Sequence, residues 1–288
     1  MVVSGAKPDE YPAAIDWIFP GDPEKAGRAL ALMKSGEFGP DSLLVVRSQS
    51  QIAGAILYQL QPGSAATIYP PGAIDTATAD TLVEAIKQRL TAFGVKQAQT
   101  LLYPVEAPRA EPLLRGGVRC IARLSLQVRT IELLEEFRAP SSSLLFLPST
   151  ASTPGFAATL EATYQGTLDC PELNDLREIH DVLMGYQEFP PGEPQGWFLV
   201  SQTGNPIGVV LLGPGSRAGI VELSYLGVIP SARGRKLGHQ LLQFALREAA
   251  ARFAECLILN VDLRNAPALQ LYLGRGFRQY DLQDVYIW

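Results

Sequence analysis

The chain has 288 residues, of which 47% are hydrophobic and 18% are charged, and its net charge is −5. This length suits two domains of roughly 130 to 150 residues, and the acidic balance argues against general nucleic-acid binding. The first residues carry no basic segment followed by an apolar one, and no apolar run reaches the roughly 18 residues of a membrane span. We therefore expect a cytoplasmic protein that does not bind membranes.

Cysteine and histidine are scarce. Cys120, Cys170 and Cys256 are far apart and odd in number, which argues against a disulfide framework and against a CxxC metal site. His180 and His239 are the two histidines, so a zinc site or a Ser-His-Asp arrangement has few residues to draw on. We expect no metal.

The first half of the chain alternates strand and helix patterns. Residues 43–57 predict two strands joined by a turn, and residues 65–70 predict a third strand. A helix is expected over 81–94, followed by a strand over 97–104. Residues 138–155, rich in Ser, Pro and Thr, are predicted to link this half to the next.

The second half has the clearer pattern of elements. Helices are predicted over 159–164, 173–186, 237–253 and 266–276, and strands over 196–202, 207–214, 218–229, 256–261 and 283–288. Residues 43–57 align with 198–212 so that two strands and their turn coincide. This self-similarity suggests a duplicated α/β fold, with domains at 1–137 and 156–288.

A basic, glycine-bearing loop precedes the expected helix at Leu237. The first N–H groups of a helix lack intrahelical partners and attract anions, and Gly234 and Gly238 let a ligand approach the backbone. Arg233 and Lys236 add charge, so the loop fits a phosphate or pyrophosphate. The alternative is a plain turn with solvated cations. Neither the P-loop pattern nor the dinucleotide-binding pattern occurs here.

The sequence ELSYLGVIPSARGRKLGHQLLQFAL, followed by NAPALQLYLGRGF, resembles the GNAT superfamily of acyl-CoA-dependent N-acyltransferases. The family pattern [QR]-x-x-G-x-[GA] is met by Arg233 and Gly238, with Lys236 in place of the middle glycine. The pattern N-x-x-A-x-x-L-Y-x-x-x-G-F is matched at every position, from Asn265 to Phe277. The resemblance implies two tandem domains, each with a mixed, mainly antiparallel twisted sheet flanked by helices.

The same resemblance implies acetyl-CoA, or another acyl-CoA, as co-substrate. Backbone groups at Leu226, Gly227 and Val228 would take the pantetheine arm and the acyl carbonyl, and Asn265 would contact the arm as well as cap its helix. The pyrophosphate would bind N–H groups of the loop residues Arg233, Gly234, Arg235, Lys236, Leu237 and Gly238. A non-glycine residue at positive φ costs on the order of 1 kcal/mol, so Lys236 marks a departure from the family's loop.

Acyl transfer to an amine requires a base for the ammonium and an acid for the thiolate. Glu222, on the strand before the loop, is the candidate base because it resembles the glutamate used by the histone-acetyltransferase branch of the family. Tyr272 is the candidate acid. The alternatives are a solvent-facing Glu222 and a Tyr272 that only packs its helix; we expect alternation to place Glu222, Ser224 and Leu226 on one face.

Substrate residues are less distinct. Thr167 and Asp169 lie where the family's first helices form the acceptor site, and Asp169 would bind a cationic amine; the alternative is that Asp169 or Asn174 caps a helix. The first half has YPPGAIDTATAD in place of the basic loop, so we expect a degenerate copy that does not bind coenzyme A.

The sequence therefore predicts an N-acetyltransferase acting on a small-molecule or peptide amine. A non-catalytic acyl-CoA sensor is the alternative, and a purely structural module would bind no coenzyme.

Overall fold

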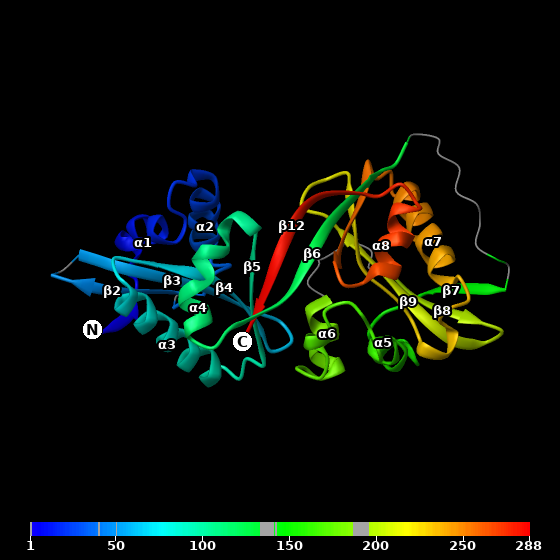
Figure 1. Ribbon diagram of the computed structural model, residues 1–288, viewed down its shortest axis with the longest axis horizontal. Coiled ribbons are helices and arrows are strands. Elements are labelled where there is room, and N and C mark those ends of the chain that lie inside the picture. Colours follow the sequence, from blue (N-terminus) through cyan, green and yellow to red (C-terminus); the bar gives the residue numbers. More distant parts are fainter. Residues whose placement is uncertain (1, 40, 50, 133–140, 142, 187–195) are drawn as a thin grey trace. The chain divides into compact units, whose positions relative to one another are not determined.

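The computed structural model describes residues 2–39, 41–49, 51–132, 141, 143–186 and 196–288. The chain forms two compact units (Figure 1). Unit 1 comprises Met1–Ile121 and Asp284–Trp288, and unit 2 comprises Ala122–Gln283. Within the described residues, no helix is both long and apolar enough to cross a membrane.

Unit 1 has a sheet in the order β1-β2-β3-β4-β5-β12. Its elements are β1 (Val3–Gly5), α1 (Tyr11–Ile18), α2 (Pro23–Ser35), β2 (Leu43–Ser48), β3 (Gln51–Gln61), β4 (Ala65–Ala73), α3 (Thr76–Ala92), β5 (Gln97–Leu102) and α4 (Glu111–Arg115), with short 3-10 helices at Pro8–Glu10 and Pro104–Ala110. Neighbouring strands from β1 to β4 are antiparallel, and β4 is parallel to β5.

Unit 2 has the strand order β12-β6-β11-β10-β9-β8-β7. Its elements are β6 (Arg119–Thr130), β7 (Leu144–Pro148), α5 (Phe156–Tyr164), α6 (Ile179–Tyr186), β8 (Gly196–Gln202), β9 (Asn205–Pro214), β10 (Ile220–Val228), α7 (Leu237–Ala251), β11 (Cys256–Asp262), α8 (Ala266–Leu273) and β12 (Arg278–Ile287), with short 3-10 helices at Pro171–Leu173 and Pro230–Ala232. Strands β7 to β10 are antiparallel, and β10 is parallel to β11. Unit 2 therefore repeats the plan of unit 1, and the predicted fold class is confirmed.

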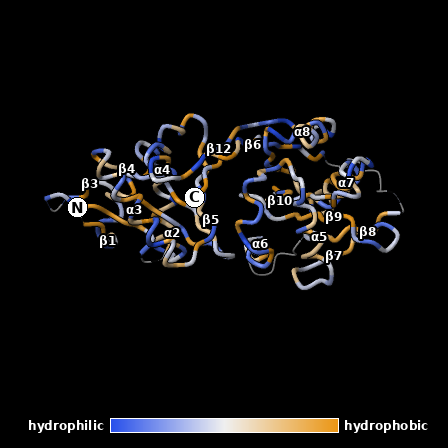
Figure 2. Tube along the Cα trace, turned by 60° about the horizontal axis from the view of Figure 1, so that its bottom comes forward, coloured by the Kyte–Doolittle hydropathy of each residue, from blue (hydrophilic) through white to orange (hydrophobic). Residues whose placement is uncertain are grey.

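Alternation along the strands gives the sheet of unit 1 two apolar faces. Leu44 and Val46 belong to the core under α3 and α4, whereas Leu43 and Val45 belong to the core under α1 and α2. Apolar segments follow the strands in Figure 2. The helices therefore lie on both faces, because either face left bare would expose these side chains to water.

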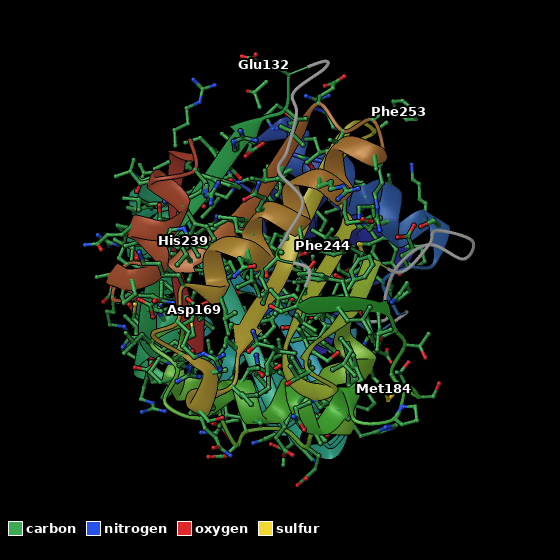
Figure 3. All side chains as sticks on the ribbon, turned by 90° about the vertical axis from the view of Figure 1, so that its right-hand side faces the viewer. Glu132, Asp169, Met184, His239, Phe244 and Phe253 are labelled. Carbon is green, nitrogen blue, oxygen red and sulfur yellow. The ribbon has the colours of Figure 1, made fainter. Side chains whose placement is uncertain are left out.

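Unit 2 is built in the same way. Phe198 and Val200 join the core under α7, while Trp197 and Leu199 join the core under α5 and α6. Phe244 of α7, labelled in Figure 3, makes an edge contact with Phe198, with ring centroids 4.7 Å apart. The two cores hold β10 and the start of α7 in fixed positions, and these elements frame the site described below.

Each unit contains a strand that comes from the other half of the sequence (Figure 1). The end of β12, Asp284–Ile287, pairs with β5 in unit 1. The end of β6, Leu124–Thr130, pairs with β11 in unit 2. The domain boundary predicted near residue 137 therefore differs from the observed one, because strand pairing assigns β6 to unit 2 and the C-terminal residues to unit 1.

The predicted linker, residues 138–155, also contains structure. Leu144–Pro148 forms β7, which pairs with β8 and so extends the sheet of unit 2. Its apolar sequence LLFLP explains the pairing, because Leu144 is buried in the core beneath α7. Residues 138–140 and 142 of this prediction lie outside the described residues.

Candidate active site

The site begins where two parallel strands separate. Strands β10 and β11 pair only at Ile220–Glu222 with Cys256–Ile258. Beyond this point β10 stays with β9 and β11 stays with β6. A pocket of about 250 Å³ opens there, and its walls include Leu223–Val228 of β10 and residues of α8.

A bulge in β10 changes which side chains share a face. The register against β9 shifts between Leu223 and Tyr225, so Ser224 is the extra residue. Leu223 and Leu226 both lie on the α7 side, whereas Tyr225 packs with the core under α5 and α6. The expectation that Glu222, Ser224 and Leu226 share one face is therefore wrong: Glu222 lies on the face of Tyr225.

Glu222 is partly buried, and its carboxyl group is a weaker acid than an exposed glutamate. Burial raises the pKa of its carboxyl group, and its charge in turn acts to raise the pKa of Tyr186 on α6. Within the described part of the chain, its side chain has no hydrogen-bond or ion-pair partner, and it is not among the residues lining the 250 Å³ pocket. The alternative of a fully solvent-facing Glu222 does not hold.

In the loop before α7, several backbone N–H groups have no hydrogen-bond partner among the described residues. Gly234 has φ 77° and Lys236 has φ 59°, so Lys236 adopts the left-handed conformation that is costly for a non-glycine residue. Lys236 is the N-cap of α7 and supplies no side-chain cap, which leaves the first N–H groups of the helix without an internal partner. Arg233 is the exception, because its N–H donates to the carbonyl oxygen of Pro230 at 3.2 Å. The available donors therefore start at Gly234.

The guanidinium of Arg233 ties the loop to its neighbours. Its Nε donates to the Val228 oxygen at 3.0 Å, Nη1 to the Gly166 oxygen at 3.1 Å and Nη2 to the Thr163 oxygen at 2.8 Å. These bonds join the loop to the end of β10 and to the residues at the end of α5. Three of its five N–H donors are thereby used to position the loop, and phosphate binding by this side chain stays a prediction.

Tyr272 and Asn265 lie at opposite ends of α8, and both line the pocket. Asn265 caps the helix as predicted, because its Oδ1 accepts from the Ala268 N–H at 3.3 Å. Tyr272 is only 8% exposed and packs against Phe277. Burial, and then the charge of Asp169, raise the pKa of Tyr272.

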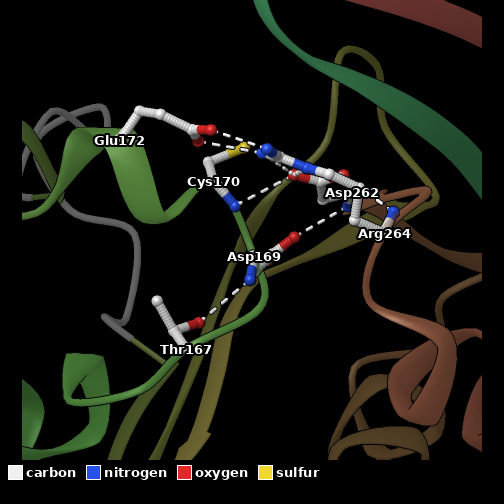
Figure 4. A network of polar contacts seen from close by, with 6 residues as sticks. All are labelled: Thr167, Asp169, Cys170, Glu172, Asp262 and Arg264. Atoms are coloured by element: carbon white, nitrogen blue, oxygen red, sulfur yellow. Dashed lines mark hydrogen bonds and ion pairs between the residues drawn. The ribbon is translucent and has the colours of Figure 1, made fainter.

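Asp169 and Thr167 lie in the segment between α5 and α6, and both line the pocket. Asp169 Oδ1 accepts from the Asp262 N–H at 2.7 Å, and the Asp169 N–H donates to Thr167 Oγ1 at 3.1 Å (Figure 4). Asp169 therefore does not cap a helix. Asn174 does not cap α6 either, because it lies five residues before Ile179 and its amide donates to the Tyr164 oxygen at 3.3 Å.

Asp262 is the residue that sequence reasoning missed. It is fully buried at the end of β11, where it accepts hydrogen bonds from the Arg264 guanidinium and from the Cys170 N–H at 3.2 Å. Arg264 also binds both oxygens of Glu172, at 2.6 and 2.9 Å. The only sequence signal was a single Asp after an apolar strand, and its partners lie about 90 residues earlier.

A second hollow of about 460 Å³ lies beside α5 and α6. Tyr164, Asn174 and Arg177 are among its walls, and Gly166 lines both this hollow and the 250 Å³ pocket. Sequence reasoning did not find it, since its walls come from two helices and the residues between them. Among the described residues, no group of three His, Cys, Asp or Glu side chains has the arrangement of a metal site.

Comparison with known proteins matches this site to one family. Residues 160–277 match the model of the Acetyltransferase (GNAT) family. A mycothiol acetyltransferase of Streptomyces bingchenggensis is 32% identical over 132 residues, which are 45% of this chain and 42% of that protein. The chain thus spans less than half the length of that relative. A mycothiol acetyltransferase of Mycolicibacterium smegmatis is 27% identical over 231 residues, 74% of this chain and 75% of its own.

Solved structures share the fold at low sequence identity. A GCN5-related N-acetyltransferase from Sphaerobacter thermophilus aligns with a TM-score of 0.59 and 16% identity, covering 100% of this chain and 95% of its own. A tandem GNAT protein from the clavulanic acid biosynthesis pathway aligns with a TM-score of 0.52 and 15% identity, covering 100% and 98%. These structural matches show the fold, and the family-model match assigns residues 160–277, which lie in unit 2, to the GNAT family.

Proposed function

We propose that unit 2 transfers an acetyl group from acetyl-CoA to a primary amine. The observation that carries this proposal is the pocket between the separated strands, which reaches from Tyr272 to Arg233 at the loop before α7. A thioester placed there would have its acyl end beside Tyr272 and its phosphates at the helix start.

The residues present fit coenzyme A. The N–H groups from Gly234 to Gly238 have no described hydrogen-bond partner outside the helix, and the dipole of a 15-residue helix favours an anion at this end. A Cβ at Gly234 would meet nothing within 4 Å, so the loop is open to a ligand. The edge of β10 from Tyr225 to Val228 has no ladder to β11, which leaves backbone groups for an extended arm.

Tyr272 is proposed as the acid that protonates the departing thiolate. Its raised pKa keeps the phenol protonated at neutral pH. The attacking amine must first lose a proton, because an alkylammonium has a pKa near about 10. Two carboxyl groups near the site have a raised pKa and can accept this proton, Glu222 and Asp169. Glu222 is the one to which the family resemblance points.

The acceptor is proposed to enter by the 460 Å³ hollow. Gly166 lies on its wall and on that of the 250 Å³ pocket, so an amine at Asp169 would leave the rest of the acceptor among Tyr164, Asn174 and Arg177. Relatives named mycothiol acetyltransferase make the acceptor of those enzymes the first compound to test.

Calorimetric titration with acetyl-CoA, followed by an amine screen that measures released thiol, tests the proposal. We expect one binding site per chain and turnover with at least one primary amine. Binding without turnover of any amine, including the acceptor of mycothiol acetyltransferases, would favour a non-catalytic acyl-CoA sensor. Absence of binding would contradict the acetyltransferase proposal itself, and two sites per chain would contradict an empty unit 1.

A further inference from the structure

Asp169 is the acidic side chain that lies in the 250 Å³ pocket together with Tyr272. It comes from the segment between α5 and α6, not from β10. The charge of Asp169 acts on three phenols around the pocket, since it contributes to raising the pKa of Tyr272, Tyr225 and Tyr186. Asp169 therefore lines the same pocket as the proposed acid, Tyr272, and as Tyr225 of β10.

One oxygen of Asp169 is held and the other is available. Oδ1 accepts from the Asp262 N–H at 2.7 Å. Within the described ranges, no donor binds Oδ2. The Asp169 N–H donates to Thr167 Oγ1 at 3.1 Å, and the Cys170 N–H donates to Asp262 at 3.2 Å, so the backbone of the loop is held at the end of β11 (Figure 4). This geometry leaves Oδ2 as an acceptor for a group inside the pocket.

The neighbouring carboxyl group, that of Asp262, is kept ionised. Although burial opposes its charge, hydrogen bonds from Arg264 and Cys170 lower the pKa of Asp262. Burial, partly offset by the Asp262 N–H and reinforced by the Asp262 charge, raises the pKa of Asp169. Two adjacent carboxyl groups whose environments separate their pKa values are a recurring arrangement for acid–base work.

Glu222 differs from Asp169 in position. Its charge acts on Tyr186 of α6, and it does not line the pocket that holds Tyr272. A base must come within hydrogen-bond reach of the amine, directly or through one water. We propose that Asp169 is the general base, and that its Oδ2 accepts the proton of the acceptor's ammonium group at the thioester; this inference rests on the function proposed above.

The proton balance of the reaction follows from these roles. The ammonium gives one proton to Asp169 Oδ2, and the neutral nitrogen attacks the thioester carbon, forming the C–N bond. The C–S bond then breaks, and the thiolate takes the hydroxyl proton of Tyr272. The new amide nitrogen loses its extra proton through water, which restores the Tyr272 phenol, and Asp169 releases its proton to solvent. One proton is released for each amide formed.

The charge of Asp169 depends on groups from each element packed around it. They are Tyr186 of α6, Tyr225 of β10, Tyr272 of α8, Asp262 at the end of β11, Arg264 just after it, and Cys170 in the same loop. Burial raises the pKa of the Cys170 thiol to about 12, and that of Tyr186 to about 12. Cys170 and Tyr186 therefore stay protonated at neutral pH, and titration of Asp169 would set the acid limb of the pH profile of kcat/KM.

The test compares Asp169→Asn with Glu222→Gln in the full chain, using acetyl-CoA and the best amine of the screen. Asparagine keeps an Oδ1 that can accept from the Asp262 N–H, so acetyl-CoA affinity should stay within about twofold. We expect kcat/KM to fall by about 10²- to 10⁴-fold and its acid limb to disappear. Asp169→Glu should keep an acid limb at a reduced rate.

Glu222→Gln should keep the acid limb of the wild-type protein. An acid limb that survives Asp169→Asn, with only KM raised, would contradict proton transfer to Asp169. Loss of that limb in Glu222→Gln alone would assign the base to Glu222. Both results would leave the acetyltransferase proposal standing, whereas wild-type protein that binds acetyl-CoA but acetylates no amine would contradict both proposals.

Discussion

Unit 1 and unit 2 share one arrangement of strands and helices, but the environments of their acidic side chains differ. In unit 1, pairing and backbone hydrogen bonds lower the pKa of Glu10, Asp22, Asp75 and Glu106. In unit 2, burial raises the pKa of Asp169 and Glu222. Paired carboxylates stabilise a fold, whereas carboxyl groups with a raised pKa are poised to exchange protons. Hydrogen bonds lower the pKa of Asp262 in unit 2 as well, so the contrast concerns Asp169 and Glu222 and supports the proposal that proton transfer takes place in unit 2.

The N-termini of the equivalent helices α3 and α7 also differ between the units. Asp75 caps α3, with its Oδ1 accepting from the Thr78 N–H at 2.8 Å. Lys236 begins α7 without a side-chain cap. A carboxylate already occupies the anion-attracting end of α3, so a phosphate would meet a negative charge there. This explains in physical terms why we expect coenzyme A to bind one unit only.

One feature is common to both units because the framework requires it. Gly72 of β4 and Gly227 of β10 stand at equivalent positions near the ends of their strands. A Cβ at Gly72 would overlap the backbone oxygen of Trp17 in α1, and a Cβ at Gly227 would lie 2.7 Å from Thr163 in α5. The close approach of the first helix of each unit to this strand is therefore common to both units.

The largest effect is expected from Gly72→Ala. Because the collision is with backbone, strand and helix must move apart, and we expect unit 1 to lose about 3 kcal/mol or more of stability. Thermal unfolding measures the loss, and Gly27→Ala is the matched control. A Cβ there meets nothing within 4 Å in the middle of α2, so alanine should stabilise by roughly 0.5 to 1 kcal/mol. Equal melting temperatures for the two variants would refute the argument.

Lys236→Asp is designed to give unit 2 the helix start of unit 1. A carboxylate at this position replaces a cation and repels phosphate, so acetyl-CoA affinity should fall by about 10- to 100-fold, or roughly 1.4 to 2.8 kcal/mol. Calorimetry at low ionic strength measures the change, and a melting temperature close to that of wild type shows that α7 is intact. Unchanged affinity would place the phosphates elsewhere.

Asp75→Ala removes the cap of α3. We expect a loss of about 1 kcal/mol of stability because one N–H at the helix start loses its acceptor. Acetyl-CoA binding should not change, since this helix start is not part of the proposed site. A second acetyl-CoA site in calorimetry would contradict this expectation and would show that the Asp75 cap is what prevents binding in unit 1.

The smallest loss of stability at neutral pH is expected when the ion pair between Glu10 and Arg47 is removed. Glu10 Oε2 and Arg47 Nη2 are 2.5 Å apart. The hydrogen bond from Arg47 is the main reason that the pKa of Glu10 falls to about 2. A lowered folded-state pKa means that this stabilisation is complete above the ordinary pKa of 4.5 and disappears as the pH falls toward 2. Glu10→Gln should lose that pH dependence, which hydrogen exchange of β2 peptides between pH 2 and 6 would detect. Parallel pH profiles of hydrogen exchange for the variant and the wild type would contradict a stabilising role for this ion pair.

Much of the site could be predicted because its signals are local. Asn265 and Ala268 are three residues apart, so the cap of α8 could be predicted from the sequence. The apolar alternation around β9 and β10 and the basic loop were likewise visible within short windows. The exchange of β6 and β12 was not visible, because two similar strands can pair with either sheet and only the complete set of pairings selects one.

The sequence by itself determined the duplicated strand and helix order, the family motifs and the residues at the start of α7, since each depends on neighbours within a few positions. The tertiary structure alone decided that a bulge at Ser224 turns Glu222 away from Leu226, and that Arg233 binds backbone oxygens of α5 and β10. It also decided that Asp169 meets Asp262, 93 residues away. Contacts over such separations depend on how the chain closes on itself, which no local pattern encodes.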